Sequence, residues 1–250
     1  MMSPLSPQES NGGLSPSNPG LEAELKFFSL LRNLPPSTLD HFPSITITTG
    51  YIRDAISVLG QRLRDEPSFA DLDYTEFSYA RVREESEAGS DPRFSVAFKG
   101  PKLADGSRIE IEGSIAPPLA RDLLANTEGI TKKTRFITVG EVVIEDDSFR
   151  IRADIDLLTN WGPKLASLRA LSLDWVTIDI ECPDSKCFRG IRSGDHDLDF
   201  LKNPGILELS SDLKWLTRSI TMIHIAKYGV DIECSKAIEE LSRRASSASA

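Results

Sequence analysis

The segment Glu22-Ala23-Glu24-Leu25-Lys26 places two carboxylates and one ammonium at every second position. Because side chains alternate between the two faces of a β-strand, a strand here would carry Glu22, Glu24 and Lys26 on one face and the two apolar residues on the other. By itself this pattern is typical of a strand with one face in water. Its meaning therefore depends on whether other parts of the chain repeat it.

Strand-like segments further along the chain repeat the alternation of charged and apolar residues. In the segment 108–112, Arg108, Glu110 and Glu112 share one face and two isoleucines share the other. A sheet whose charged side is concave and closes into a barrel or tunnel, with helices over its apolar side, satisfies both faces. The expected strands after the first span residues 44–52, 73–84, 93–99, 108–112, 131–139, 148–158 and 176–181.

The chain divides into a leader, a sheet region and a helical region. Residues 1–20 are rich in Ser, Pro, Asn and Gly and poor in apolar residues, so we expect them to be disordered. The sheet region is 21–185, and residues 186–250 should form helices that pack on the outer wall of the barrel, before a frayed tail. The expected helices span residues 53–66, 117–126, about 213–223 and about 235–244.

Composition limits the partners of the protein. The chain has 250 residues, of which 40% are hydrophobic, and can bury a sizeable core. Its formal net charge of −9 argues against nucleic acid, for which a broad basic face is expected. Its three cysteines contain no CxxC pair, and no signal peptide or membrane span is evident, so we expect a cytoplasmic protein without a membrane partner. The sequence leaves both a monomer and a homodimer open.

The order of the charged motifs resembles the CYTH domain, the family of triphosphate tunnel metalloenzymes. This family includes thiamine triphosphatases, inorganic tripolyphosphatases and class IV adenylyl cyclases. The resemblance runs from residue 22 to about 184. The motifs that carry it are Glu22-x-Glu24-x-Lys26, Gly50-Tyr51-Ile52, Arg81-x-Arg83, Lys99-Gly100, Arg108-x-Glu110-x-Glu112, Lys133-x-Arg135, Asp154-x-Asp156 and Asp179-x-Glu181.

The resemblance implies both a fold and a reaction. The fold class would be α+β, with an eight-stranded antiparallel β-barrel that forms a triphosphate tunnel and helices packed outside. The reaction would be metal-dependent hydrolysis of the terminal phosphate of a short triphosphate, with inorganic tripolyphosphate as the first candidate. The alternatives are a thiamine triphosphatase, a class IV adenylyl cyclase, or a module that binds polyphosphate or nucleotide without turnover.

The resemblance also implies roles for the basic residues. A triphosphate requires a basic wall, in which arginine gives bidentate contacts to phosphate oxygens and lysine gives point charges. The implied substrate-binding residues are Lys26, Arg81, Arg83, Lys99, Arg108, Lys133 and Arg135, and three of these, Lys26, Lys99 and Arg135, are implied to be catalytic.

The acids on the same faces imply divalent cations, because without cations they would repel the substrate. Mg²⁺ or Mn²⁺ suits a set of carboxylate oxygens, and such an ion polarises the terminal phosphoryl group and lowers the pKa of bound water. The implied ligands of one ion are Glu22, Glu24 and either Asp179 or Glu181. Those of a second, weaker ion are either Glu110 or Glu112, together with Asp156 and the other closing carboxylate.

Some polar residues have two interpretations or none. Arg150, Arg152 and Asp154 share a strand face with Asp156, and they either line the cavity or form a salt-bridged rim. We interpret Cys182 and Cys187 as small structural thiols rather than metal ligands, because no second pair of cysteines exists. The three histidines fall outside the motifs and receive no role.

Overall fold

A computed structural model describes most of the chain. The described residues are 23–35, 37–52, 56–70, 72–102, 108–127, 129–160, 175–217, 221 and 232–248. The expected disordered leader, 1–20, and the expected metal ligand Glu22 lie outside them.

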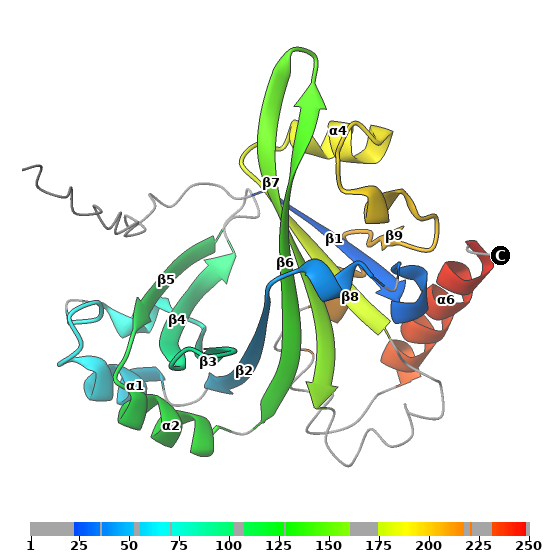
Figure 1. Ribbon diagram of the computed structural model, residues 1–250. Helices are drawn as coiled ribbons and strands as arrows, with labels where there is room; N and C mark the ends of the chain where they lie inside the picture. The colour runs from blue at the N-terminus through cyan, green and yellow to red at the C-terminus, as the bar shows by residue number, and fades with distance from the viewer. Residues whose placement is uncertain are drawn as a thin grey trace, which may run out of the picture.

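The fold is α+β, as predicted, and is built on one antiparallel sheet (Figure 1). Nine strands pair in the order β5-β4-β3-β2-β6-β7-β8-β1-β9. The strands are β1 (Ala23–Leu30), β2 (Ser44–Ile52), β3 (Tyr79–Glu87), β4 (Arg93–Lys102), β5 (Arg108–Ser114), β6 (Ile130–Ile144), β7 (Asp147–Asn160), β8 (Trp175–Cys182) and β9 (Leu207–Glu208). The helices are α1 (Ile56–Leu63), α2 (Pro117–Ala125), α4 (Cys187–Ser193) and α6 (Ile232–Ala248).

The predicted closed barrel of eight strands differs from this sheet. The order has two ends, β5 and β9, and within the described ranges no strand pairing joins them. The ninth strand explains part of the difference, because Leu207 and Glu208 pair with Phe28 and Phe27 along the outer edge of β1. That edge of β1 is therefore already occupied by β9.

Most strands lie where the alternation predicts them, and β3 is the main shift. The pattern predicts a strand from residue 73, but Asp73 instead caps a short 3-10 turn, Tyr74–Glu76, by accepting a hydrogen bond from the backbone N–H of Thr75. An aspartate that binds the backbone two residues ahead favours a turn over a strand. The strand begins only at Tyr79.

Apolar clusters cover the face of the sheet that carries no charged motifs. One cluster lies between the strands β1, β6, β7 and β8 and helix α4, and it includes the buried Leu25 and Ile178. Another lies between β3 and β4 and the helices α1 and α2, and it includes the fully buried Val82 and Phe98. Burial of each such side chain contributes about 1.5–3 kcal/mol to stability. The outer helices thus hold the charged face in place from behind.

Helix α6 packs on the other side of the sheet. Its Ile238 and Leu241 contact a cluster that includes Phe28 and Trp175, whose ring centroids lie 5.6 Å apart. Phe28 follows Lys26 by two residues in β1, so it points to the same side as the charged residues. The C-terminal helices were expected on the outer wall, but α6 instead covers one end of the charged side.

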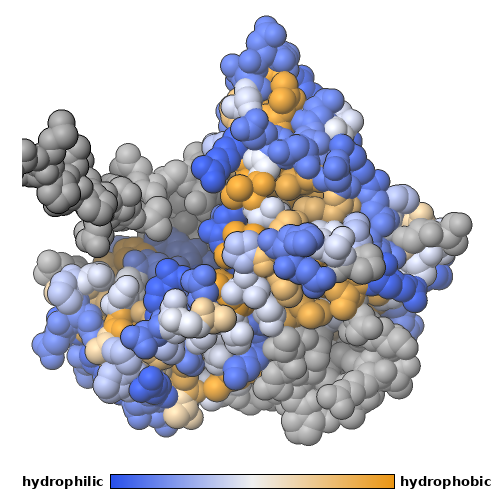
Figure 2. Space-filling model, viewed as in Figure 1, coloured by the Kyte–Doolittle hydropathy of each residue, from blue (hydrophilic) through white to orange (hydrophobic). Residues whose placement is uncertain are grey.

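The remaining helical region differs from the prediction in detail. The helix expected near 235–244 is confirmed as part of α6. Of the helix expected near 213–223, Lys214–Thr217 is a 3-10 turn, and most of the residues after it lie outside the described ranges. None of the described helices combines the length and the apolarity that a membrane span requires. The visible surface is mostly hydrophilic, with hydrophobic residues along the β6–β7 hairpin, where Val139 and Val143 are about half exposed (Figure 2).

Candidate functional site

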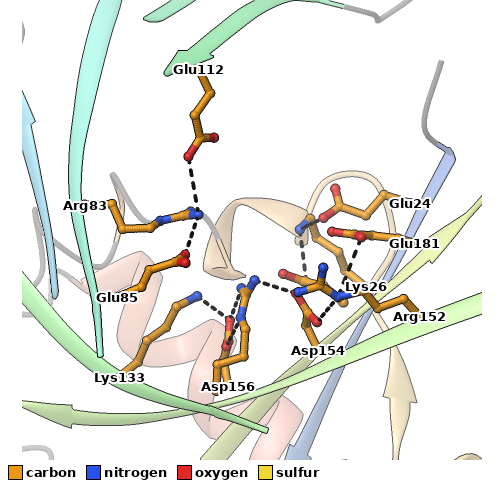
Figure 3. Close-up of polar contacts among 12 residues, drawn as sticks. Glu24, Lys26, Arg83, Glu85, Glu112, Lys133, Arg152, Asp154, Asp156 and Glu181 are labelled. Carbon is orange, nitrogen blue, oxygen red and sulfur yellow. Dashed lines mark hydrogen bonds and ion pairs between the residues drawn. The ribbon is translucent and has the colours of Figure 1, made fainter. Parts of the chain in front are cut away.

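The charged motifs of seven strands, β1 and β3 to β8, lie on one side of the sheet. We call this side the charged face, and Figure 3 shows that its labelled side chains point into one common space between strands from both halves of the sheet. The strand registers explain the gathering, because residues directly opposite each other in an antiparallel pair point to the same side. The charged face consists of Glu24, Lys26, Arg81, Arg83, Glu85, Lys99, Glu110, Glu112, Lys133, Arg135, Arg152, Asp154, Asp156, Asp179 and Glu181.

The centre of the charged face is a set of ion pairs between β6 and β7. Arg135 lies opposite Asp156 in the register and donates from Nε and Nη2 to its two carboxylate oxygens, at 2.8 and 2.9 Å. Lys133 donates to the same carboxylate. Burial opposes ionisation of Asp156, but these two cations outweigh it and lower the pKa of Asp156 to about 2. Asp156 is therefore ionised at neutral pH, and its charge is balanced by Arg135 and Lys133.

Asp154 extends this set toward the next strand. It is 1% exposed and accepts hydrogen bonds from Arg135 Nη1 and from Arg152, whose Nε lies 2.7 Å from Asp154 Oδ1. Arg152 is 43% exposed and lies 4.0 Å from Glu181 of β8. Of the three residues with two interpretations, Asp154 and Arg152 thus belong to the charged face as a salt-bridged pair, and Arg150 is exposed.

The first motif forms a second cluster with β8. Lys26 Nζ donates to Glu24 at 2.6 Å and to Asp179 at 3.0 Å, so one ammonium serves two carboxylates. Burial works against the charge of Lys26, but Asp179 and Glu24 raise its pKa above the ordinary value. Burial also raises the pKa of Asp179 to about 6; Lys26 opposes this shift, whereas the neighbouring carboxylates of Asp156 and Glu24 add to it. The cluster therefore has an excess of negative charge.

The third cluster lies on β3, β4 and β5. Lys99 donates to Glu110 at 2.5 Å, and Arg81 Nη2 lies 3.2 Å from Glu110 and 3.3 Å from Glu112. Arg83 Nη1 lies 3.2 Å from Glu85 on its own strand and 4.0 Å from Glu112. The pairs of Arg81 and Arg83 are longer than those of Asp156, and the glutamates of this cluster are more open to solvent than Asp156, whose side chain is 7% exposed.

Two donors of this cluster lack a partner within the part of the chain that the structure describes. The buried Nε atoms of Arg81 and Arg83 have no hydrogen-bond acceptor there. Burial lowers the pKa of Arg83, and the charges of Arg81 and Arg135 lower it further. A buried donor without a partner costs about 1–3 kcal/mol, so an anion bound here would stabilise both arginines.

The acids near Lys26 suit a divalent cation in their chemistry. Glu24 and Asp179 already share one cation, Glu181 lies opposite Glu24 in the register, and all three offer the oxygen ligands that Mg²⁺ and Mn²⁺ prefer. Burial is the main cause of the raised pKa of Asp179, and the carboxylates of Asp156 and Glu24 add to it, so a bound cation would oppose the shift. As the described side chains stand, however, no three His, Cys, Asp or Glu residues converge on one point, because the ammonium of Lys26 lies between Glu24 and Asp179.

The structure brings together nearly all of the predicted site residues. Two are not placed there: Glu22 is outside the described residues, and Arg108 has its backbone in β5 but no described side chain. Sequence reasoning missed Glu85, which pairs with Arg83, although the alternation Arg81, Arg83, Glu85 continues through β3 and was the signal available. Cys182 and Cys187 are buried in the apolar cluster behind the charged face, and neither forms a disulfide bond.

Comparisons with known proteins give similarity only among solved structures. No family model matches the sequence, and no curated protein matches it. The chain is similar to HpAC1 from Hippeastrum, a putative adenylyl cyclase described as having a dominant triphosphatase activity, with 16% identity and a TM-score of 0.43 over 83% of this chain and 97% of that one. It is also similar to the inorganic triphosphatase NE1496, with 13% identity and a TM-score of 0.32 over 66% of this chain and 75% of that one.

A further structure, described as the hypothetical protein NE1496, matches with 14% identity and a TM-score of 0.33 over 67% of this chain and 80% of that one. Two of these similar solved structures are thus described as having triphosphatase activity.

Proposed function

We propose that the charged face binds a short triphosphate and hydrolyses its terminal phosphate with the help of Mg²⁺ or Mn²⁺, with inorganic tripolyphosphate as the first candidate substrate. The observation that carries this proposal is the pair of arginines on β3 whose buried Nε atoms have no acceptor within the described residues. Guanidinium groups of this kind match phosphate oxygens in charge and in geometry.

The spread of basic residues favours a chain of phosphates over a single one. Arg83 comes from β3 and Lys26 from β1, on opposite sides of the β6–β7 hairpin, and both point into the same space (Figure 3). Lys133 projects from β6 between them. A linear chain of phosphates that lies between the two halves of the sheet would contact several of these basic groups at once, whereas a single phosphate would not reach them all.

The acidic cluster around Lys26 is where we place the cation. Glu24, Asp179 and Glu181 would hold it, with Glu22 of the same motif as a further ligand. When bound, the ion would offset phosphate charge and polarise the terminal phosphoryl group. Lys26, released from its two carboxylates, would then donate to a phosphate oxygen. Transfer to water needs positioning and charge neutralisation, and no covalent nucleophile.

The test is a phosphate-release assay with tripolyphosphate, ATP and thiamine triphosphate, each with Mg²⁺, with Mn²⁺ and with excess EDTA. We expect release of phosphate from tripolyphosphate with a metal ion and none with EDTA. Preferred cleavage of thiamine triphosphate would make that compound the substrate in place of tripolyphosphate. Formation of cyclic AMP from ATP would identify a cyclase. Tight binding of all three compounds without any product would replace hydrolysis by a binding function.

A further inference from the structure

The two glutamates of β5 occupy the basic groups that the proposed substrate would need. Glu110 accepts from Lys99 at 2.5 Å and from Arg81 at 3.2 Å. Glu112 lies 3.3 Å from Arg81 and 4.0 Å from Arg83. Figure 3 shows Glu112 reaching down toward Arg83 from the top of the view. A carboxylate in this position offers the same kind of acceptor oxygens as a phosphate.

The register of the strands makes this contact possible. Arg81 on β3 lies opposite Ala97 on β4, and Ala97 lies opposite Glu112 on β5. Because Ala97 is small, the two long side chains on either side of it meet above it. Ser95, also short, donates its hydroxyl to Glu112 at 2.8 Å and fixes one carboxylate oxygen. The contact is therefore built into the sheet.

The glutamates lie on the solvent side of the arginines. The side chains of Glu110 and Glu112 are 35% and 40% exposed, against 12% and 15% for Arg81 and Arg83. They also belong to β5, which is one end of the sheet and pairs only with β4 in the described strand order. An anion that approaches from solvent would thus meet these carboxylates before the less exposed arginines.

We propose that Glu112, with Glu110, is a built-in competitor of the phosphate ligand, which occupies Arg81 and Arg83 in the free protein and must be displaced before an anion binds. This inference rests on one part of the proposed function, namely that the arginines bind a polyphosphate. It gives the β5 carboxylates a role that needs no metal ion. Contacts with further basic groups, such as Lys133, would offset the free energy needed to displace the glutamates. An anion that makes few such contacts would not displace them.

The test measures anion binding without metal and without turnover. Isothermal titration calorimetry in EDTA gives the dissociation constants of tripolyphosphate and of pyrophosphate for the wild type and for Glu112→Gln. The glutamine keeps the acceptor for Ser95 and removes the charge. We expect both anions to bind about fivefold more tightly to the variant, the size of one exposed ion pair. Unchanged or weaker binding would overturn the inference.

Two further variants separate this outcome from general charge effects and from the proposed function. Glu84→Gln removes the same charge from β3, but Glu84 alternates with Arg83 and Glu85 and points away from the charged face, so it should change binding less than twofold. Arg83→Ala should weaken binding in the wild-type background. If Arg83→Ala weakens binding and Glu112→Gln does not tighten it, only the competitor role fails. If neither the wild type nor Glu112→Gln binds either anion, the competitor role and the phosphate site both fail.

Discussion

Asp156 shows how much a single residue of the charged face contributes to the fold. Its carboxylate is buried and is the shared acceptor of Arg135 and Lys133. Removing one member of a buried ion set leaves uncompensated charge, which costs about 3–5 kcal/mol. We therefore expect Asp156→Asn to lower the free energy of unfolding by about that amount, measured by urea denaturation at pH 7.

An exposed ion pair provides the control for Asp156→Asn. Asp122 on α2 accepts from Arg62 at 2.5 Å, and both side chains are substantially exposed. Surface pairs contribute about 0–1 kcal/mol, so Asp122→Asn should change stability by no more than that. Equal effects of the two substitutions would show that the Asp156 set is not a buried network.

His196 predicts a pH dependence of stability. It is buried, its Nδ1 has no partner within the described residues, and burial followed by the charge of Lys202 lowers its pKa below the ordinary 6.5. Below pH 6.5 the unfolded chain therefore takes up a proton that the folded protein resists, and the folded protein loses stability. His196→Gln should remove this loss.

The measurement compares urea unfolding of the wild type and His196→Gln between pH 7.5 and pH 5. The difference in free energy of unfolding should be constant above about pH 7 and should shift against the wild type as the pH falls below the ordinary histidine pKa. A difference that stays constant over the whole range would show that His196 titrates alike in both states.

At the scale of the secondary-structure elements, the packing of α4 on β6 depends on one glycine. A Cβ atom at Gly190 would lie 2.7 Å from Val142 Cγ1, closer than real contacts allow. Both residues are buried in the interface behind the charged face. Overpacking of this kind costs about 1–3 kcal/mol, so we expect Gly190→Ala to lower the thermal midpoint measurably.

The neighbouring Arg189 supplies the control for this interface. It lies on the same helix, is 71% exposed and pairs with the exposed Glu145 at 3.1 Å, a surface pair that contributes about 0–1 kcal/mol. Arg189→Ala should leave the thermal midpoint nearly unchanged. A Gly190→Ala protein as stable as Arg189→Ala would mean that α4 can shift away from β6 without loss.

The elements also show what sequence periodicity can predict. A weak alternation around Ile45, Ile47 and Tyr51 predicted β2 at its observed bounds, and the alternation of charged and apolar residues predicted β5 almost at its bounds. It missed α4 and β9, which have seven and two residues, too few for a periodic signal. These elements form because other parts of the fold offer them a surface or a free strand edge.

Within the site, the sequence predicted which residues share a face but not how they pair. Same-face charges follow from a period of two, and the structure gathers them as expected. Their partners depend on register between distant strands, such as Arg135 opposite Asp156. The sheet ends at β9 because Leu207 and Glu208 pair with β1, which lies far away in sequence. No local sequence pattern predicts this pairing.

At the scale of the whole molecule, local charge differs from net charge. The chain carries a formal net charge of −9, which alone would repel a polyphosphate. The sheet nevertheless places Arg81, Arg83 and Lys99 together on β3 and β4 and pairs them with glutamates that are partly exposed. The proposed anion site would thus be a property of the fold and not of the composition.

The most direct test of a phosphate site on the charged face is the KM for tripolyphosphate of Arg83→Ala, with Arg93→Ala as the control. Arg93 is 73% exposed at the margin of the same sheet and carries the same charge. Loss of charge-assisted hydrogen bonds to phosphate should raise the KM of Arg83→Ala about 10- to 100-fold, while Arg93→Ala stays within about twofold. An unchanged KM for Arg83→Ala, with its fold confirmed by circular dichroism, would contradict such a site.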